Sequence, residues 1–200
     1  MSDNTFNILI VGVGGQGVLL ASEIISEAGM TFGLDVKKSE VHGMSQRGGI
    51  VSSHIKIAPK VYSPTIEYGQ ADVLMSFEQA EGLRAMDWMK KDGVAIISRT
   101  QLIPAIVTSS KKFHYPEDAI TRMREKAGRV IAVEADKIAA ELGNPRLVNT
   151  ILLGVLSNYL PFETDLWIEV LKSKVKEKFV EINIQAFNRG RQVQLSSVEV

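Results

Sequence analysis

Cysteine is absent from the 200-residue chain. Its absence excludes disulfide bonds, thiolate catalysis, zinc sites built on cysteine and cysteine-ligated iron–sulfur clusters on this chain. Any electron carrier that works with the protein must therefore be held elsewhere.

An excess of charge of one sign is also absent. The chain has 23 Lys plus Arg and 23 Asp plus Glu, with no block of like charge. This balance gives no electrostatic attraction to nucleic acid or to an acidic membrane surface. We therefore expect neither nucleic acid nor a membrane as a partner.

Long apolar runs are lacking too. The longest run after the first strand, residues 151–156, is much shorter than the roughly 20 residues that span a bilayer. Residues 1–4 carry no positive charge and the next apolar run is interrupted by glycines, so we expect no signal peptide. The sequence predicts a cytoplasmic protein.

The size and the apolar content suit one compact domain. With 45% apolar residues the chain can bury a single good core, and no internal repeat or long linker divides it. We predict one domain over residues 1–190 and a tail over residues 191–200 that has no core pattern.

A glycine-rich turn follows the first apolar segment. Residues 6–11 indicate a strand that is buried on both faces, and residues 18–32 have the spacing of an amphipathic helix that ends at Gly33. The glycines between them match G-x-G-x-x-G. The residues of this turn that we consider as ligand contacts are Gly12, Gly14, Gly15, Gln16 and Gly17.

An anion could bind at this turn, because a helix N-terminus presents unpaired N–H groups and a partial positive charge. Val18 and Leu19 stand where a nucleoside-triphosphate loop needs Lys and Ser or Thr, which excludes an NTPase. Glu40 lies where an NAD-binding fold has its ribose-binding acid. A nucleotide-like ligand and a purely structural turn both remain open.

A second loop carries polar side chains close to this turn. The connection between the predicted strands 36–40 and 50–57 is shorter than the dozen or so residues that a parallel crossover needs. The two strands should therefore pair antiparallel or not be neighbours. The side chains in this loop that could contact an anionic ligand are His42, Ser45, Gln46 and Arg47. The structural alternative is that Arg47 pairs with Glu40 and His42 caps the loop.

The rest of the chain alternates strands and helices. We predict strands at 73–77, 94–98 and 130–133, and helices at 76–91, from 116, and at 135–142, 147–159, 164–175 and 178–188, the last ending at Gly190. The second helix should open with a capping box at Ser76 and end at Gly93. This order predicts a three-layer α/β/α sandwich with a Rossmann-like, mixed and mostly parallel sheet.

Other residue patterns have simpler interpretations. The segment 43–47 begins like a serine nucleophile elbow but has Arg47 in place of the last glycine. The three histidines lack metal-ligand spacing. We expect His54 to face solvent or a partner, His114 to lie on the surface, and Asn149 to be a buried, hydrogen-bonded amide. Trp88 and Trp167 are expected in the core or an interface.

The chain resembles the gamma-type subunits of 2-oxoacid:ferredoxin oxidoreductases, and most closely the small (beta) subunits of the indolepyruvate branch. The likeness covers nearly the whole chain, and its most specific part is the run His42-Gly43-Met44-Ser45-Gln46-Arg47-Gly48-Gly49. It includes the glycine turn, Ser39–Val41, Ala71–Leu74, Gly143–Pro145, Asn149–Gly154, Lys178-Phe179 and Asn183.

The resemblance implies a fold like domain III of pyruvate-ferredoxin oxidoreductase and a subunit that is inert alone. It implies a large alpha subunit that holds thiamine diphosphate and iron–sulfur (4Fe–4S) clusters, coenzyme A as co-substrate, and ferredoxin reached through the complex. The residues agree, since the chain lacks cysteine and Lys91 precedes Asp92-Gly93 where a thiamine motif needs glycine. A stand-alone NAD-type oxidoreductase and a non-catalytic interaction module are the alternatives.

Overall fold

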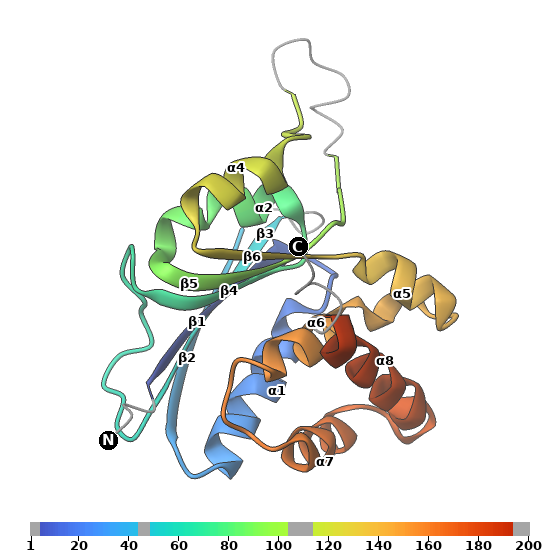
Figure 1. Cartoon of the computed structure of the whole chain (residues 1–200). Helices are drawn as coiled ribbons and strands as arrows, with labels where there is room; N and C mark the ends of the chain where they lie inside the picture. Colours follow the sequence, from blue (N-terminus) through green and yellow to red (C-terminus); the bar gives the residue numbers. More distant parts are fainter. Residues whose placement is uncertain (1–4, 44–48, 104–113, 194–200) are drawn as a thin grey trace.

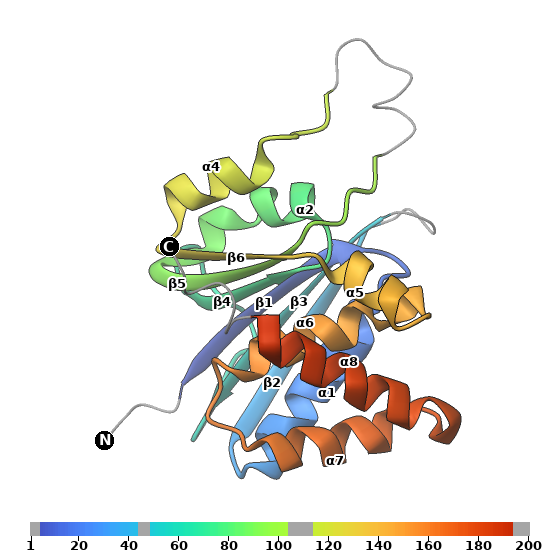
Figure 2. The same ribbon diagram turned by 45° about the vertical axis from the view of Figure 1, so that its right-hand side comes forward.

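The computed structural model describes residues 5–43, 49–103 and 114–193. Within these ranges, no helix is long and apolar enough to cross a membrane. One sheet runs through the middle of the molecule, with helices on both sides (Figures 1 and 2). The predicted three-layer α/β/α arrangement is confirmed.

The sheet has six strands in the order β2-β3-β1-β4-β5-β6. Strands β1, β4, β5 and β6 pair in parallel, whereas β3 is antiparallel to both of its neighbours. The sheet is therefore mixed and mostly parallel, as the sequence predicts. The strands are β1 Phe6–Val13, β2 Asp35–His42, β3 Ile50–Ala58, β4 Ala71–Ser76, β5 Met89–Ser98 and β6 Arg129–Val133.

Strand β3 lies between β1 and β2, and this insertion follows from the short connection after β2. The β2–β3 pair is antiparallel from Asp35 opposite Ala58 to His42 opposite Val51, as the connection length predicts. Strand β2 is consequently at the edge of the sheet. In the usual dinucleotide fold, by contrast, the second strand is next to the first.

Helices cover the sheet unevenly (Figure 2). Helices α2 and α4 lie on one face, over β4 to β6, and α1 and α5 to α8 lie on the other. The helices are α1 Val18–Thr31, α2 Gln79–Arg84, α4 Ala119–Lys126, α5 Ala135–Glu141, α6 Val148–Ser157, α7 Thr164–Lys174 and α8 Val180–Val193. Short 3-10 turns are η1 Met86–Trp88, η2 Pro145–Leu147 and η3 Glu177–Phe179.

Strand β1 contributes to the hydrophobic core on both sides of the sheet. Ile8 and Ile10 pack in the cluster under α1, while Leu9 and Val11 pack in the cluster that includes residues from α2 and α4. All four side chains are buried, so the prediction of a strand covered on both faces is confirmed.

The helix after β4 is shorter than predicted. Its N-cap is Glu78, whose carboxylate accepts from the Glu81 N–H at 2.9 Å, so the prediction of a cap at Ser76 is wrong. The helix ends at Arg84, and β5 already starts at Met89 and continues through Gly93. A Cβ at Gly93 would lie 3.0 Å from the Ala71 carbonyl oxygen. The glycine therefore permits close approach of β4 and β5 instead of ending a helix.

The last helix also differs from its prediction. Helix α8 starts at Val180 and continues past Gly190 to Val193, so the first residues of the predicted tail are helical. A Cβ at Gly190 would lie 2.0 Å from the Ile151 carbonyl oxygen, and one at Gly154 would lie 2.1 Å from the Phe187 carbonyl oxygen. These two glycines allow the backbones of α6 and α8 to touch.

His54 is buried within the chain, so the expectation that it faces solvent or a partner is wrong. The connection after β3 folds over its side of the sheet, and the Ile66 N–H donates to Nδ1 of His54 at 3.2 Å. The Trp88 ring contacts it edge-on at 4.8 Å between centroids. Burial, with a smaller contribution from the charge of Lys56, lowers the pKa of His54. Trp167 is fully buried, which confirms a core position, whereas Trp88 is half-buried and packs against the core cluster on the α2 and α4 side of the sheet.

Candidate functional site

The glycine turn leads from β1 into an uncapped helix N-terminus. Gly15 and Gly17 have φ values of 97° and 87°, which L side chains rarely adopt. No side chain caps α1, and its first turn contains no acidic residue. The N–H groups at the start of α1 therefore have no capping side chain and lie beside the positive end of the helix dipole. Within the turn, the Gly14 and Gln16 N–H groups already donate to the Gly49 and Val13 carbonyl oxygens. This geometry is suited to an anion.

Gln16 holds the turn in place. Its Oε1 accepts from the Val13 N–H at 2.7 Å, and its Nε2 donates to the Phe77 carbonyl oxygen at 2.9 Å. Gly12 packs against the same residue, since a Cβ there would lie 2.9 Å from Cβ of Phe77. The amide of Gln16 thus joins the turn to the carboxyl end of β4, which is a structural task for this candidate ligand residue.

The turn contacts the last residue of the second loop, Gly49. The Gly14 N–H donates to the Gly49 carbonyl oxygen at 2.9 Å, and the Gly43 N–H donates to the Ile50 carbonyl oxygen at 2.8 Å. His42 is exposed at the end of β2. The other predicted contacts of this loop, Ser45, Gln46 and Arg47, lie outside the described residues.

Glu40 is occupied by neighbours within the fold. One of its oxygens accepts from Ser22 Oγ and from Lys38 Nζ, each at 2.9 Å. Burial by itself would raise the pKa of Glu40, but the hydrogen bonds from Lys38 and Ser22 outweigh it and lower the pKa. Strand β3 also separates Glu40 from β1. Its surroundings therefore differ from those of the ribose-binding acid in the usual dinucleotide fold.

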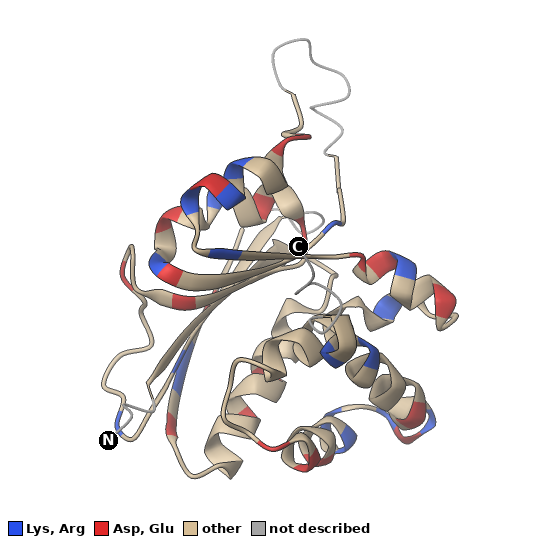
Figure 3. Ribbon diagram, viewed as in Figure 1, with Lys and Arg blue, Asp and Glu red and all other residues tan. Residues whose placement is uncertain are grey.

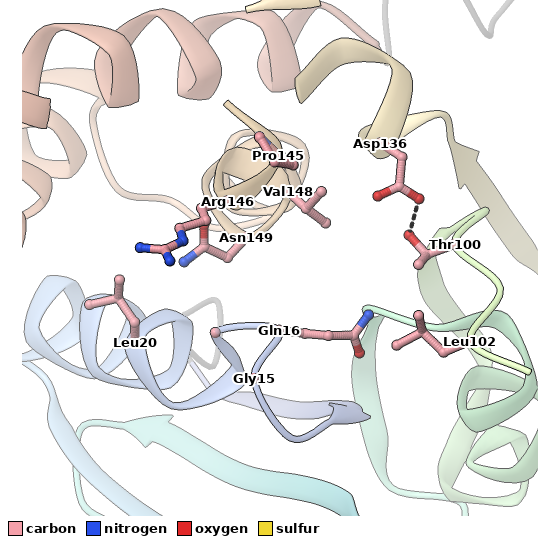
Figure 4. Close-up of a pocket in the computed structure, with 11 residues that line it drawn as sticks. Gly15, Gln16, Leu20, Thr100, Leu102, Asp136, Pro145, Arg146, Val148 and Asn149 are labelled. Carbon is pink, nitrogen blue, oxygen red and sulfur yellow. Dashed lines mark hydrogen bonds between the residues drawn. The ribbon is translucent and has the colours of Figure 1, made fainter. Parts of the chain in front are cut away.

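A cleft of about 610 Å³ opens between the glycine turn and the start of α6 (Figure 4). Residues from four parts of the chain line it. They are Gly15, Gln16, Gly17 and Leu20 from the turn and α1, Thr100 and Leu102 after β5, Asp136 on α5, and Pro145, Arg146, Val148 and Asn149 on η2 and α6.

Arg146 is the cation of this cleft that sequence reasoning missed. Its backbone N–H donates to Asn144 Oδ1 at 3.0 Å, and this cap sets the start of η2. The side chain is exposed and lies beside Asn149 in Figure 4. Across the cleft, Asp136 accepts from Thr100 Oγ1 at 2.6 Å. The cleft therefore has a basic end and an acidic end.

Asn149 closes the wall between α6 and the turn. It is buried, and its Oδ1 accepts from the Thr150 N–H at 2.8 Å, which confirms the predicted buried amide. A Cβ at Gly17 would lie 2.9 Å from Nδ2 of Asn149. Glycine is thus required at position 17 both by its φ and by this contact.

A buried carboxylate supports the opposite wall. Glu78 accepts from the Leu102 N–H at 3.3 Å and also from the Tyr115 hydroxyl. Burial and the neighbouring Glu78 raise the pKa of Tyr115. The carboxylate of Glu78 thus links the backbone of Leu102 to the side chain of Tyr115.

Metal ligands do not gather in the described ranges, where no group of three or more His, Cys, Asp or Glu side chains could hold an ion. His114 is exposed, as predicted. Acidic and basic residues both occur on α4 and α5 (Figure 3). The site therefore depends on backbone N–H groups and on a few side chains.

Comparison with protein families decides the relationship. The family model described as pyruvate ferredoxin/flavodoxin oxidoreductase matches residues 7–193. The chain belongs to this family. The resemblance that the sequence carries in the turn and in residues 42–49 is thereby confirmed.

Two archaeal members of the family show how complete the match is. The chain is 39% identical over 188 residues to the indolepyruvate oxidoreductase subunit IorB of Archaeoglobus fulgidus, covering 92% of each protein. It is 36% identical over 190 residues to the subunit of that name from Pyrococcus horikoshii, covering 92% of this chain and 94% of the relative. The chain is thus similar to these proteins along nearly their whole length.

Solved structures confirm the fold. The gamma subunit of a keto/oxoacid ferredoxin oxidoreductase from Geobacter sulfurreducens has a TM-score of 0.71 at 22% identity and covers 96% of this chain and 99% of its own. A 2-oxoglutarate:ferredoxin oxidoreductase from Magnetococcus marinus has a TM-score of 0.77 at 20% identity, covering 100% of this chain but 32% of its own. The fold therefore occurs both as a separate subunit and as part of a longer chain.

Proposed function

We propose that this chain is the small subunit of a 2-oxoacid:ferredoxin oxidoreductase whose substrate is indolepyruvate or another arylpyruvate. Support comes from relatives at 36% to 39% identity that carry the name indolepyruvate oxidoreductase subunit. The enzyme decarboxylates the oxoacid oxidatively, transfers the acyl group to coenzyme A and passes the electrons to ferredoxin.

A large alpha subunit supplies the thiamine diphosphate and the 4Fe–4S clusters on this proposal. The composition of the chain supports this division, because it contains no cysteine to ligate a cluster. Ferredoxin then meets the complex through the partner. The chain alone is inert, and we place the complex in the cytoplasm.

The chain's own contribution is an anion-binding wall beside the thiamine site of the partner. The observation that carries this proposal is the uncapped N-terminus of α1, which faces a cleft of about 610 Å³ with Arg146 at its edge. The second loop ends next to the turn, as the Gly14–Gly49 hydrogen bond shows. The N–H groups at the start of α1 and the guanidinium groups of Arg47 and Arg146 would bind the diphosphate of coenzyme A or the carboxylate of the oxoacid.

Co-expression with the thiamine-binding subunit tests the assembly. We expect a stable heteromer that reduces ferredoxin when supplied with indolepyruvate and coenzyme A, and no activity from either subunit alone. If the chain remains separate from that subunit at micromolar concentrations, the assignment as a subunit is wrong.

Kinetics of the assembled enzyme test the wall. Replacing Arg47 with Ala should raise KM for coenzyme A or for the oxoacid about ten-fold or more, because a charge-assisted hydrogen bond is lost. Arg122→Ala is the control, since Arg122 lies on α4 at the opposite face of the sheet and pairs with Asp118 at 3.8 Å. If Arg47→Ala and Arg122→Ala give equal KM values, the second loop does not contribute to the site.

A fluorescence titration with NADH separates the alternative. A stand-alone dinucleotide enzyme would bind NADH in the isolated chain, and Glu40→Ala would weaken that binding. We expect no such binding, because Glu40 is already bonded to Ser22 and Lys38.

A further inference from the structure

A second pocket continues the cleft on the other side of Arg146. It has a volume of about 460 Å³ and lies between α1, η2 and the segment that joins α7 to α8. Leu20, Arg146 and Asn149 line both spaces. We call this second space the basic pocket. Its lining consists of Leu20, Asn144, Arg146, Leu147, Asn149, Lys174, Val175, Lys176, Phe179 and Asn183.

The charged residues of the basic pocket are all cations. Arg146, Lys174 and Lys176 line it, and no acidic residue does so in the part of the chain that the structure describes. Lys174 pairs with Glu27 at 3.3 Å, which lies outside the lining. Arg146 and Lys176 form no ion pair within the described residues. The chain as a whole is neutral, so this local excess favours an anionic ligand.

The frame around these cations is rigid. Asn183 is buried, accepts from Thr150 Oγ1 at 2.7 Å and donates to the Phe179 carbonyl oxygen at 2.8 Å. These bonds tie α6 to α8 and to η3, so the position of Phe179 is set by two helices. Phe179 as a residue nevertheless remains 39% exposed, with the Lys178 ammonium over one face of its ring at 4.9 Å from the centroid. A base could therefore lie against a fixed apolar wall made by Phe179 and its neighbours Leu20 and Val175.

We propose that the basic pocket binds a phosphorylated nucleotide, with its phosphate on Arg146 and Lys176 and its base against Phe179. A planar guanidinium and an ammonium are suited to a phosphate monoester, and the apolar wall is suited to a purine. The nucleotide could be free or could be the 3′-phosphoadenosine end of coenzyme A extending from the adjoining cleft. The second source rests on the proposed function, whereas the first does not.

Isothermal titration of the full chain, without any partner, tests the pocket with adenosine 3′,5′-bisphosphate as the probe. We expect one bound molecule per chain. Arg146→Ala and Lys176→Ala should each weaken binding about ten-fold or more, the effect of losing one charge-assisted hydrogen bond. Phe179→Ala should weaken binding of the bisphosphate but leave binding of pyrophosphate unchanged. Arg122→Ala is the matched control and should bind like the parent.

Further titrations distinguish the two sources. If coenzyme A binds tighter than both the bisphosphate and dephospho-coenzyme A, the occupant is the nucleotide end of coenzyme A. If the bisphosphate binds as tightly as coenzyme A, the occupant is a free nucleotide. Absence of bisphosphate binding, or binding that Arg146→Ala and Lys176→Ala leave unchanged, overturns the proposal. Neither result depends on catalysis, so failure of the oxidoreductase assignment would be recognised separately.

Discussion

Replacing Gly17 with Ala isolates the contact that joins the glycine turn to α6. The added Cβ would lie 2.9 Å from Nδ2 of Asn149 and 3.3 Å from its Cγ. Asn149 cannot move away freely, because it is buried and its Oδ1 is bonded to the Thr150 N–H. Gly33 supplies a matched control, since it has a φ of 94° and a Cβ added there would meet no atom within 4 Å.

The two variants share one energy term and differ in the other. Ala in the left-handed region costs about 1–2 kcal/mol at both positions. Gly17→Ala should lose about 1–3 kcal/mol more, the usual effect of overpacking a buried site. The extra loss corresponds to a Tm lower by about 2–4 °C per kcal/mol for a domain of this size.

Urea unfolding of the isolated chain measures both variants, with and without Asn149→Ala. In the Asn149→Ala background the effect of Gly17→Ala should fall to that of Gly33→Ala, giving a coupling energy of about 1–3 kcal/mol. Equal losses for Gly17→Ala and Gly33→Ala, with no coupling to Asn149, would refute the view that this amide fixes the turn.

Other perturbations test the corrected parts of the fold. The pKa of His54 is lowered in the folded chain, so at this residue the unfolded chain binds more protons below about pH 6.5. The free energy of unfolding should therefore fall as the pH is lowered below about 6.5, by at most about 1.4 kcal/mol per pH unit. Urea titrations across pH measure this dependence, and His54→Asn should abolish it. Gly190→Ala should destabilise the protein by about 3 kcal/mol, because the added Cβ separates α6 from α8. Asn188→Ala on the same helix is the control and should change stability little. If the two variants have comparable melting temperatures, the close contact between α6 and α8 is contradicted. Glu78→Gln presents an amide to N–H donors and should lose about 1–3 kcal/mol in chemical denaturation, more than Tyr115→Phe; a smaller loss than in the Tyr115 variant would count against the buried acceptor.

Elements whose signals are local were predictable from the sequence. The first strand, the turn with Gly17 and the helix after it depend on neighbours in the chain. The antiparallel β2–β3 pair follows from the length of one connection. The mixed sheet and its three layers could therefore be derived before any coordinates.

Two of the errors arose at glycines, because the same residue serves two physical purposes. Gly33 ends α1 at positive φ, as predicted. Gly93 and Gly190 have no positive φ and are there because a carbonyl oxygen of another element lies against them. Whether a missing Cβ permits a turn or a close contact depends on a partner that the local sequence does not name.

The sequence by itself determined the family, the order of the elements and the position of the glycine turn, since these follow from motifs and periodicity. Only the tertiary structure decided what faces the turn. Arg146, Thr100 and Asp136 come from separate segments of the chain that converge when the helices pack on the sheet. Their distances in the chain carry no signal, because packing of the core, and not any local preference, brings them to one cleft.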